Sequence, residues 1–555
     1  MRVGFRRLPL AACLAVLATA LVPGAAHAAF SISSFSATTV KADDSLYTQA
    51  GGVPDRGITI TSFSGNPLAG EVIRNLRVDV PPGVITSVAS VPTCNNAVAA
   101  LCPVTSQIGT TSLLVSDGVN PPFTVGPLPV YNMDPPADRI SEFAFSLPSN
   151  PRVKILGGVR WDDDYGTYFE LNDIPAPGGG NPIILSTNLT FFGNPADHVV
   201  GATSAPFVRL PTFCGPPYTT KVTAEAWNGT VVTATDTTPT GATGCDQVPF
   251  TPSISVTPST TKRDSPAGAD VTVNLPDVPD PADIGQSHVQ DTSVTLPEGM
   301  TINPSVANGL QTCTDAQFGK GTTGPVTCPD AAKVGTARIV SAAVPTPLTG
   351  TVWLGEPQPG NPYRVFLQAT GAGVDTRLIG DVKADPQTGR LTTTFADTPQ
   401  TPFTEFTISM TAGPRAVFAT PLACGPGQST STLTPWSGQG NASPSATTAP
   451  FDANGAGGAC DPAATPTTNY SSYDAADRLI TAGTAYDAFG RATAVPGADA
   501  GGAPITASYY ANDLAASAGQ GTEARAWGLD PLRRVRTETA TGAQPPTPPS
   551  HTTTT

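Results

Sequence analysis

Eight cysteines downstream of residue 28 repeat as two sets of four, and this repeat constrains the fold more than any other feature of the chain. The first set is Cys94, Cys102, Cys214 and Cys245, and the second is Cys313, Cys328, Cys424 and Cys460. Equivalent cysteines lie between 210 and 226 residues apart. Four landmarks that recur in one order indicate a tandem duplication of a module of about two hundred residues.

The neighbours of the cysteines repeat as well. Both copies contain Val-x-x-Pro-x-Gly or a close variant, Cys-Pro-x5-Gly-Thr, Cys-Gly-Pro, Trp-x-Gly and Cys-Asp, beginning at 78, 102, 214, 227 and 245 and at 294, 328, 424, 436 and 460. We therefore divide this part of the chain into module 1, residues 29–249, and module 2, residues 250–462. Because each copy has the complete set, each is expected to own a core and to fold alone.

Both modules have the sequence pattern of antiparallel β-structure. With 59 Pro and 55 Gly in 555 residues, the chain is poor helix material. Apolar residues alternate with polar ones in several segments, as at Leu76, Val78 and Val80, at Leu189 and Phe191, and at Phe406, Ile408 and Met410. A period of two predicts strands that bury one face. We expect an all-β protein with two tandem β-sandwich modules.

The even number of cysteines predicts disulfides rather than metal thiolates, because the chain carries an export signal. Four cysteines per module allow three connectivities. Proximity along the chain favours local loops, with pairs 94–102, 214–245, 313–328 and 424–460.

The export signal occupies residues 1–28. Arg2, Arg6 and Arg7 precede an apolar run at 8–22, and Ala-His-Ala at 26–28 fits signal peptidase. An alternative interpretation places a lipid anchor on Cys13. No later stretch reaches the ~20 apolar residues of a membrane span. The product is expected to be secreted and extracellular, or associated with the cell surface, with no membrane span once the signal is removed.

The charge balance excludes one class of partner. The formal net charge is −14, from 29 basic and 43 acidic residues. Nucleic-acid binding needs clustered Lys and Arg, so no nucleic-acid partner is expected. The partners expected instead are a cell-wall or other extracellular glycan, or a protein.

Residues that could carry catalysis are sparse. Of the four His, His198 and His288 lie in the modules, and neither recurs in the other copy. No catalytic residue and no cofactor is predicted. Asp162, Asp163 and Asp164 form the one acidic cluster that could hold Ca²⁺, and the alternative is a solvated hairpin turn. Trp227 and Trp436 are interpreted as packing residues.

A different repeat follows module 2. Tyr473, Asp474 and Arg478 have the same spacing as Tyr486, Asp487 and Arg491, and the second copy also has Gly490. Tyr-Asp-x-x-Gly-Arg resembles the YD repeat of Rhs and teneurin-like proteins, and 508–517 and 527–536 resemble the units that follow it. The resemblance implies hairpins whose Asp caps the turn, whose Gly supplies a positive φ, and whose Arg returns along the next strand.

The resemblance covers residues 463–541, and residues 542–555 have the composition of a disordered tail. In the family, many such hairpins stack into a shell, whereas three or four units cannot close one. Two interpretations follow: the segment is a truncated remnant of a longer shell, or it is a short docking strand for another chain.

The modules resemble uncharacterised repeat modules of secreted actinobacterial proteins, which implies no activity. The sequence therefore predicts a non-catalytic secreted or cell-surface protein with duplicated β-sandwich modules and a truncated Rhs-type segment, acting in contact, adhesion or delivery. The alternative is an extracellular polysaccharide-binding or polysaccharide-hydrolysing enzyme, because paired carboxylates need no local signature.

Overall fold

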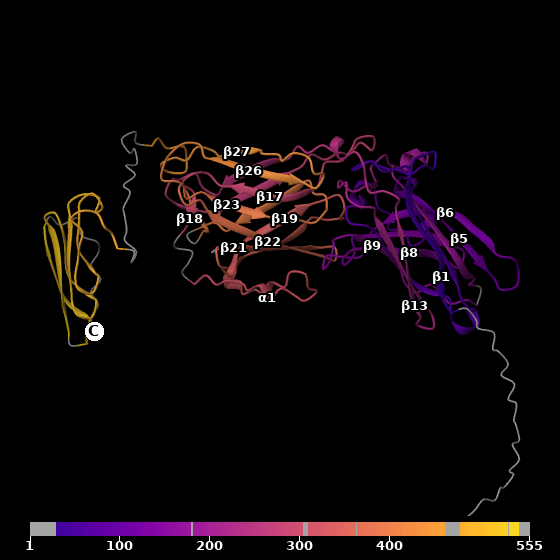
Figure 1. The fold of residues 1–555 in the computed structure, drawn as a ribbon, viewed down its shortest axis with the longest axis horizontal. Coiled ribbons are helices and arrows are strands. Elements are labelled where there is room, and N and C mark those ends of the chain that lie inside the picture. The colour runs from indigo at the N-terminus through magenta and orange to yellow at the C-terminus, as the bar shows by residue number, and fades with distance from the viewer. Residues whose placement is uncertain are drawn as a thin grey trace, which may run out of the picture. The chain divides into compact units, whose positions relative to one another are not determined.

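A computed structural model describes residues 29–178, 181–303, 309–361, 363–413, 416–460, 478–530 and 532–542. The chain divides into two compact units, one ending at Cys460 and one beginning at Asp461. The described residues are nearly all β, as the composition predicts (Figure 1). The signal sequence, the end of the C-terminal tail, Tyr473 and Asp474 lie outside the described residues.

Module 1 is built on one sheet of eleven strands in the order β1-β2-β10-β5-β6-β7-β8-β9-β3-β12-β13. Adjacent strands are antiparallel throughout. A short pair, β11 with β4, lies outside this sheet. The strands are β1 Ser31–Val40, β2 Arg56–Ser64, β3 Ile73–Asp79, β4 Ile85–Thr86, β5 Gln107–Ser116, β6 Phe123–Met133, β7 Ser141–Leu147, β8 Asn150–Val159, β9 Thr167–Leu171, β10 Ile183–Phe192, β11 Val208–Arg209, β12 Thr219–Ala226 and β13 Val231–Thr237.

Module 2 repeats the strand order of the long sheet. Its eleven-stranded sheet has the order β14-β16-β24-β19-β20-β21-β22-β23-β17-β26-β27, and β15, β25 and β18 form a small second sheet. Its only α-helix among the described residues is α1, Asp315–Phe318. The strands are β14 Ser253–Pro258, β15 Pro266–Ala267, β16 Ala269–Asn274, β17 Val289–Thr295, β18 Thr301–Ile302, β19 Lys333–Val340, β20 Leu348–Gly355, β21 Tyr363–Gly371, β22 Val374–Ala384, β23 Leu391–Phe395, β24 Glu405–Met410, β25 Phe418–Ala419, β26 Gln428–Pro435 and β27 Ser445–Thr447.

Each long sheet folds back on itself, so that its two halves face each other as in a sandwich. In module 1, the ring of Phe169 on β9 lies 5.8 Å from that of Phe191 on β10, although four strands separate β9 from β10 in the sheet. The two edge strands also meet, because Asp236 on β13 accepts a hydrogen bond from the Ala37 N–H on β1 at 2.8 Å. The apolar core therefore lies between the two halves of one curled sheet.

Two of the repeated glycines are explained by backbone geometry. Gly109 and Gly335, the glycines of the Cys-Pro-x5-Gly-Thr motif, each follow a register shift at the start of β5 and β19. A Cβ at either position would collide with a backbone carbonyl of the adjacent strand, that of Thr190 or Ser409. Glycine is thus required in both copies, because the neighbouring strand leaves no room for a side chain.

The four disulfides pair the cysteines as proximity along the chain predicts: Cys94–Cys102, Cys214–Cys245, Cys313–Cys328 and Cys424–Cys460. Each is contained within one module. Each closes a loop of between 8 and 36 residues, which restricts the unfolded chain.

This pairing leads to a first prediction. The denatured but unreduced protein, freed of its signal sequence, should show no reactive thiol in a titration with a thiol reagent, and eight after reduction. Two or more reactive thiols before reduction would contradict the pairing.

The two modules contact each other within the first unit. Arg209 of module 1 donates to the carbonyl oxygens of Val278 and Asp283 at 2.8 and 2.9 Å. The ring of Phe213 packs edge-on against Trp436 at 5.7 Å. Ile140 of module 1 belongs to a core cluster made mostly of module 2 residues. Independent folding of the modules stays a prediction, and these contacts imply that each would lose stability when separated.

The second unit is a single antiparallel sheet in the chain order β28-β29-β30-β31-β32-β33. Its strands are β28 Ala485–Tyr486, β29 Ala492–Val495, β30 Ile505–Tyr509, β31 Ala515–Gln520, β32 Glu523–Leu529 and β33 Val535–Thr541. No described residue of this unit is buried. Residues 478–530 and 532–542 therefore supply no second layer of the kind that ordinarily covers a sheet.

Candidate functional site

The acidic cluster of module 1 lies in the turn that follows β8. Asp164 accepts hydrogen bonds from Arg160 Nε at 2.8 Å and from the Gly166 N–H at 2.9 Å, and all three aspartates are exposed. Within the described ranges, no three His, Cys, Asp or Glu side chains are grouped so that they could hold a metal. The three aspartates thus lie in an exposed turn, and the Ca²⁺ site stays a prediction.

The two histidines of the modules lie in different environments. His198 stacks on Phe192 with ring centroids 4.3 Å apart, and its Nε2 lies 3.3 Å from Asp55 Oδ1. His288 lies at the module junction, where its backbone N–H donates a hydrogen bond to Thr212 Oγ1 at 3.1 Å. Burial lowers the pKa of His288 to about 4, so this imidazole is neutral at neutral pH.

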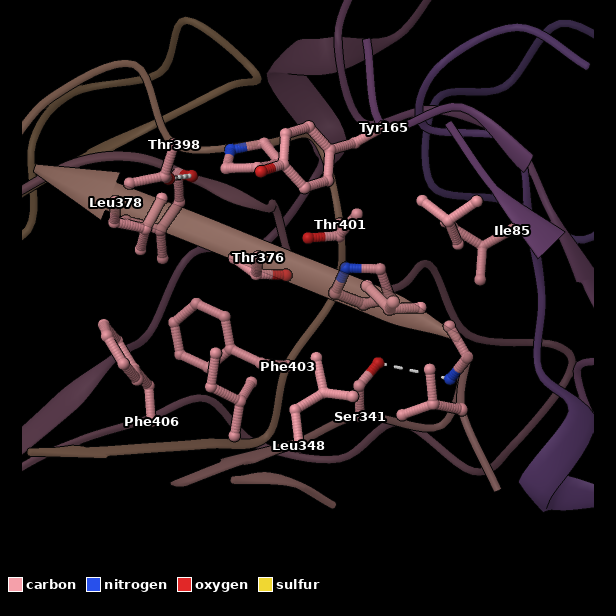
Figure 2. A pocket seen from close by; sticks show the side chains of 18 of the residues that line it. Ile85, Tyr165, Ser341, Leu348, Thr376, Leu378, Thr398, Thr401, Phe403 and Phe406 are labelled. Atoms are coloured by element: carbon pink, nitrogen blue, oxygen red, sulfur yellow. Dashed lines mark hydrogen bonds between the residues drawn. The ribbon is translucent and has the colours of Figure 1, made fainter. Parts of the chain in front are cut away.

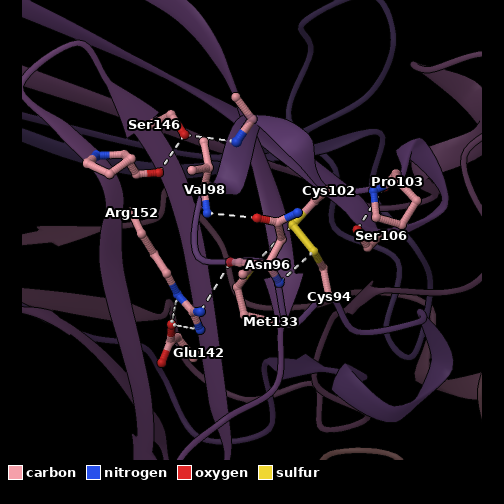
Figure 3. The surroundings of a disulfide bond; sticks show 12 residues. Cys94, Asn96, Val98, Cys102, Pro103, Ser106, Met133, Glu142, Ser146 and Arg152 are labelled. Atoms are coloured by element: carbon pink, nitrogen blue, oxygen red, sulfur yellow. Dashed lines mark hydrogen bonds and ion pairs between the residues drawn. A yellow bond between two sulfur atoms is a disulfide. The ribbon is translucent and has the colours of Figure 1, made fainter.

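An arginine side chain binds the first disulfide loop of each module. In module 1, Arg152 pairs with the buried Glu142 and donates to the Asn96 carbonyl at 3.2 Å, inside the Cys94–Cys102 loop (Figure 3). In module 2, Arg377 is 3% exposed and pairs with Asp375 at 2.7 Å. It donates to the carbonyl oxygens of Phe318, Gly319 and Gly324, inside the Cys313–Cys328 loop. These ion pairs therefore have a structural role.

A small cavity of about 90 Å³ lies at the module junction. Figure 2 shows Ile85 and Tyr165 of module 1 opposite Thr376, Thr401 and other module 2 residues. Tyr165 also accepts a hydrogen bond from the Arg377 N–H at 3.3 Å, and burial raises the pKa of its hydroxyl. This cavity is too small for most ligands, since ligand pockets ordinarily measure roughly 300–1,000 Å³.

Module 2 contains a much larger cavity, of about 490 Å³, between the two halves of its sheet. Most of the residues that line it are aliphatic or aromatic: Val271, Val273, Val294, Leu296, Ile302, Leu310, Val334, Val352, Leu354, Val365, Val382, Leu391, Phe395, Phe406, Ile408, Met410, Val417 and Phe418. The polar residues of the lining are Thr292, Asn303, Tyr363, Arg364 and Thr393. The guanidinium of Arg364 is engaged by Asp315 at 2.9 Å.

The equivalent space in module 1 is filled by four phenylalanines. Phe143 contacts Phe169, Phe191 and Phe207 with ring centroids 5.7, 5.2 and 5.8 Å apart. The cavity that remains between these halves of the sheet measures about 150 Å³. Aromatic rings at these distances fill a core and attract one another.

Strand register identifies the module 2 residues that replace these phenylalanines. Met133 forms an isolated β-bridge with Cys94, and Gly355 forms the equivalent β-bridge with Cys313. Counted from these two residues, the strand pairing places Val365 of module 2 at the position of Phe143 in module 1. Thr393 replaces Phe169, since each lies opposite the valine of the Val-x-x-Pro motif. Met410 replaces Phe191, since each lies opposite the motif glycine. Val417 replaces Phe207, each seven residues before a Cys-Gly-Pro.

All four replacements are smaller than Phe, and all four line the cavity. Each is also half-buried, although it points into the interior of the module. The sequence analysis missed this site. A signal for it was present, because aligning the two copies on their shared landmarks shows four aromatic positions lost together.

Module 1 has a second cleft, of about 480 Å³, at a different place in its sheet. Arg152, Lys154 and Asp173 are among the residues that line it. Three charged side chains thus border this cleft, whereas Arg364 is the one charged residue in the lining of the module 2 cavity.

The turn between β28 and β29 is capped by an aspartate. Asp487 Oδ1 accepts hydrogen bonds from the N–H groups of Phe489 and Arg491 at 2.9 and 3.0 Å. Gly490 has a φ of 80°. Arg491 then pairs with Asp487 Oδ2 at 2.7 Å. Of the first copy of the motif, Arg478 alone is described, with its guanidinium 5.6 Å from the Tyr486 ring.

The same turn recurs at Asp530. Its Oδ1 accepts from the N–H groups of Leu532 and Arg534 at 2.8 and 3.0 Å, and Arg533 occupies the glycine position with a φ of 63°. A non-glycine residue at a positive φ is strained, which makes this copy the less favourable one. Phe489 and Leu532 take the same turn position and are 76% and 72% exposed.

Comparisons with known proteins identify no family. No family model matches the chain, and no curated protein matches it. Among solved structures, the C-terminal domain of the AgI/II polypeptide BspA of Streptococcus agalactiae aligns with 75% of this chain and 99% of its own, at 9% identity and a TM-score of 0.19. A biofilm-associated protein BSP domain aligns with 78% of this chain and 60% of its own, at 9% identity and a TM-score of 0.14. A type II cohesin dyad of the ScaA scaffoldin of Acetivibrio cellulolyticus aligns with 73% of this chain and 94% of its own, at 9% identity and a TM-score of 0.14. Likeness at these TM-scores carries no argument about fold or function.

A search of the described residues for membrane spans found no helix with the length and apolarity needed to cross a bilayer.

Proposed function

We propose that this chain is a non-catalytic exported protein that works by contact, at a cell surface or in the extracellular medium. The two disulfide-bonded modules serve as its scaffold, and the YD-like sheet makes the contact. Four intramodular disulfides support export, because such bonds persist in oxidising compartments. The partner class is an extracellular protein or a cell-wall glycan.

The unburied C-terminal sheet is the observation that carries this proposal. Six strands are present, but no described residue from 478 to 542 is buried. A sheet gains most of its stability from a covered apolar face, so this one has the most to gain from a partner. Its turns at 487–491 and 530–534 follow β28 and β32, so they are the first and the fifth turns of the meander. In a meander of antiparallel strands, the first, third and fifth turns lie at the same end of the sheet. Phe489 and Leu532 are exposed at that end.

The acidic side chains support a non-catalytic role. In the described residues, each carboxyl group whose pKa departs from its ordinary value has it lowered. For example, the Thr261 hydroxyl, before other hydrogen-bond donors, lowers the pKa of Asp452 to about 2. A general acid for glycoside hydrolysis needs the opposite, a raised pKa. The acids with shifted pKa serve as turn caps and ion-pair partners.

An array of soluble polysaccharides and extracellular proteins tests this proposal. We expect specific binding by the purified chain and no release of sugar. The double variant Phe489→Ser with Leu532→Ser should lose binding at least tenfold, whereas Leu68→Ser, a 98% exposed residue of module 1, should not. Release of sugar by the parent chain would establish the hydrolase alternative instead, and binding unchanged in the double variant would move the contact away from this sheet.

Limited proteolysis gives a further prediction for the C-terminal sheet. Because the sheet has no buried residue, local opening should cost little, and trypsin should cut at Arg525, Arg534 or their neighbours first. The expected product is a stable core that ends near Cys460, detected by intact mass. A segment that resists trypsin as long as the modules do would show that the purified protein already covers the sheet, by docking or by self-association.

A further inference from the structure

We infer that module 2 is a binding module for an uncharged apolar small molecule, an elongated hydrocarbon chain, held between the two halves of its sheet. The site is the cavity of about 490 Å³ bordered by Val365, Thr393, Met410 and Val417. This inference stands independently of the contact role of the C-terminal sheet.

The two modules differ in the size of the side chains at four equivalent interior positions. Their long sheets have the same strand order, so equivalent positions of the two modules can be compared. Module 1 fills that space with four phenylalanines, and module 2 has a smaller residue at every one of the four positions. Protein cores seldom leave voids larger than a water molecule, and empty volume lowers stability in proportion to its size. An occupant of module 2 would restore the contacts that the phenylalanines make in module 1.

The chemistry of the walls sets the class of occupant. Aliphatic residues from several strands line the cavity, and the charged side chain in the lining, Arg364, is already paired with Asp315. A cavity of this kind holds water poorly and takes up apolar molecules. A charged headgroup inside it would have no partner and would lose its hydration.

The polar groups of the lining are few. Thr292 and Thr393 contribute hydroxyls, and Asn303 donates a hydrogen bond to the Ala416 carbonyl at 2.8 Å. Tyr363 is 39% exposed and marks the side of the cavity that is nearest to solvent. These groups suit one neutral polar end, such as an alcohol, on a hydrocarbon chain.

Fluorescence titration of the full chain with N-phenyl-1-naphthylamine, a neutral apolar probe, tests the inference. The expected result is saturable binding that 1-dodecanol displaces. Val365→Phe and Met410→Phe each restore a bulky residue at a position where module 1 has phenylalanine, and each should weaken binding at least tenfold. Val119→Phe, at an 89% exposed site of module 1, should leave it unchanged.

Probe binding that persists in both folded cavity variants would place the probe elsewhere, for example in the cleft of module 1, and would overturn the inference. Absence of probe binding to the parent chain would overturn it as well. If the variants do not fold, the rate at which hydrogen peroxide oxidises Met410 in the parent chain, measured by peptide mass, tests the inference instead. Saturating 1-dodecanol should slow this oxidation several-fold, and an unchanged rate would contradict the inference.

Discussion

Replacing Arg377 by Met is expected to lower the free energy of unfolding of the two-module unit by about 3–5 kcal/mol. Arg377 is 3% exposed and bonds three carbonyl oxygens of the Cys313–Cys328 loop as well as Asp375. Met retains much of the side-chain volume but leaves those carbonyls and the carboxylate without their donor. Urea unfolding followed by circular dichroism measures the change.

Two further variants define the cause. Arg152→Met breaks the equivalent pair with Glu142 in module 1 and should show a loss of the same order. Arg338→Met breaks an exposed pair with Glu405, whose side chains are 48% and 37% exposed, and should change the unfolding free energy by less than about 1 kcal/mol. If Arg377→Met behaved like Arg338→Met, the disulfide loop would not depend on its arginine.

Acidification from pH 6.5 to pH 4 is expected to destabilise the same unit by about 3 kcal/mol through His288 alone. Burial lowers the pKa of His288 in the folded protein to about 4, whereas the unfolded chain has the ordinary value of about 6.5. Between these two values the unfolded state binds the proton and the folded state does not. Stability therefore rises with pH across this window and is fully regained above pH 6.5.

Urea unfolding at several pH values measures this slope. His288→Gln removes the titrating group and should flatten the curve between pH 4 and 6.5. The aspartates with lowered pKa act in a different window: Asp452, whose pKa is lowered to about 2 chiefly by Thr261, loses its contribution only below its ordinary value of 3.8. A slope that survives in His288→Gln would show that another group controls acid stability.

Much of the fold could be predicted from the sequence because duplication repeats its signals. A single Cys-Pro-x5-Gly-Thr would be a weak motif, but two in equivalent places mark a structural requirement. The structure supplies the reason, a register shift beside Gly109 and Gly335 that excludes a Cβ. Alternating residues likewise predicted strands, since they depend on local geometry alone.

The parts that could not be predicted depend on distant contacts. Alternation in Leu189 and Phe191 shows that one face is buried, but not that β10 lies opposite β9 across a curled sheet. The junction between the modules rests on single side chains such as Arg209, whose neighbours carry no pattern. The cavity depends on four residues far apart in sequence, so it becomes visible only when the two copies are compared.

The open space in module 2 at the positions where module 1 has four phenylalanines is the central claim of this account, and xenon binding in a crystal of the protein tests it most directly. Xenon enters apolar cavities without needing a chemical partner. The account predicts xenon density bordered by Val365, Thr393 and Met410, and none among Phe143, Phe169 and Phe191 of module 1. Side chains of module 2 closed together with no density between them, or xenon density among the four phenylalanines of module 1, would contradict it.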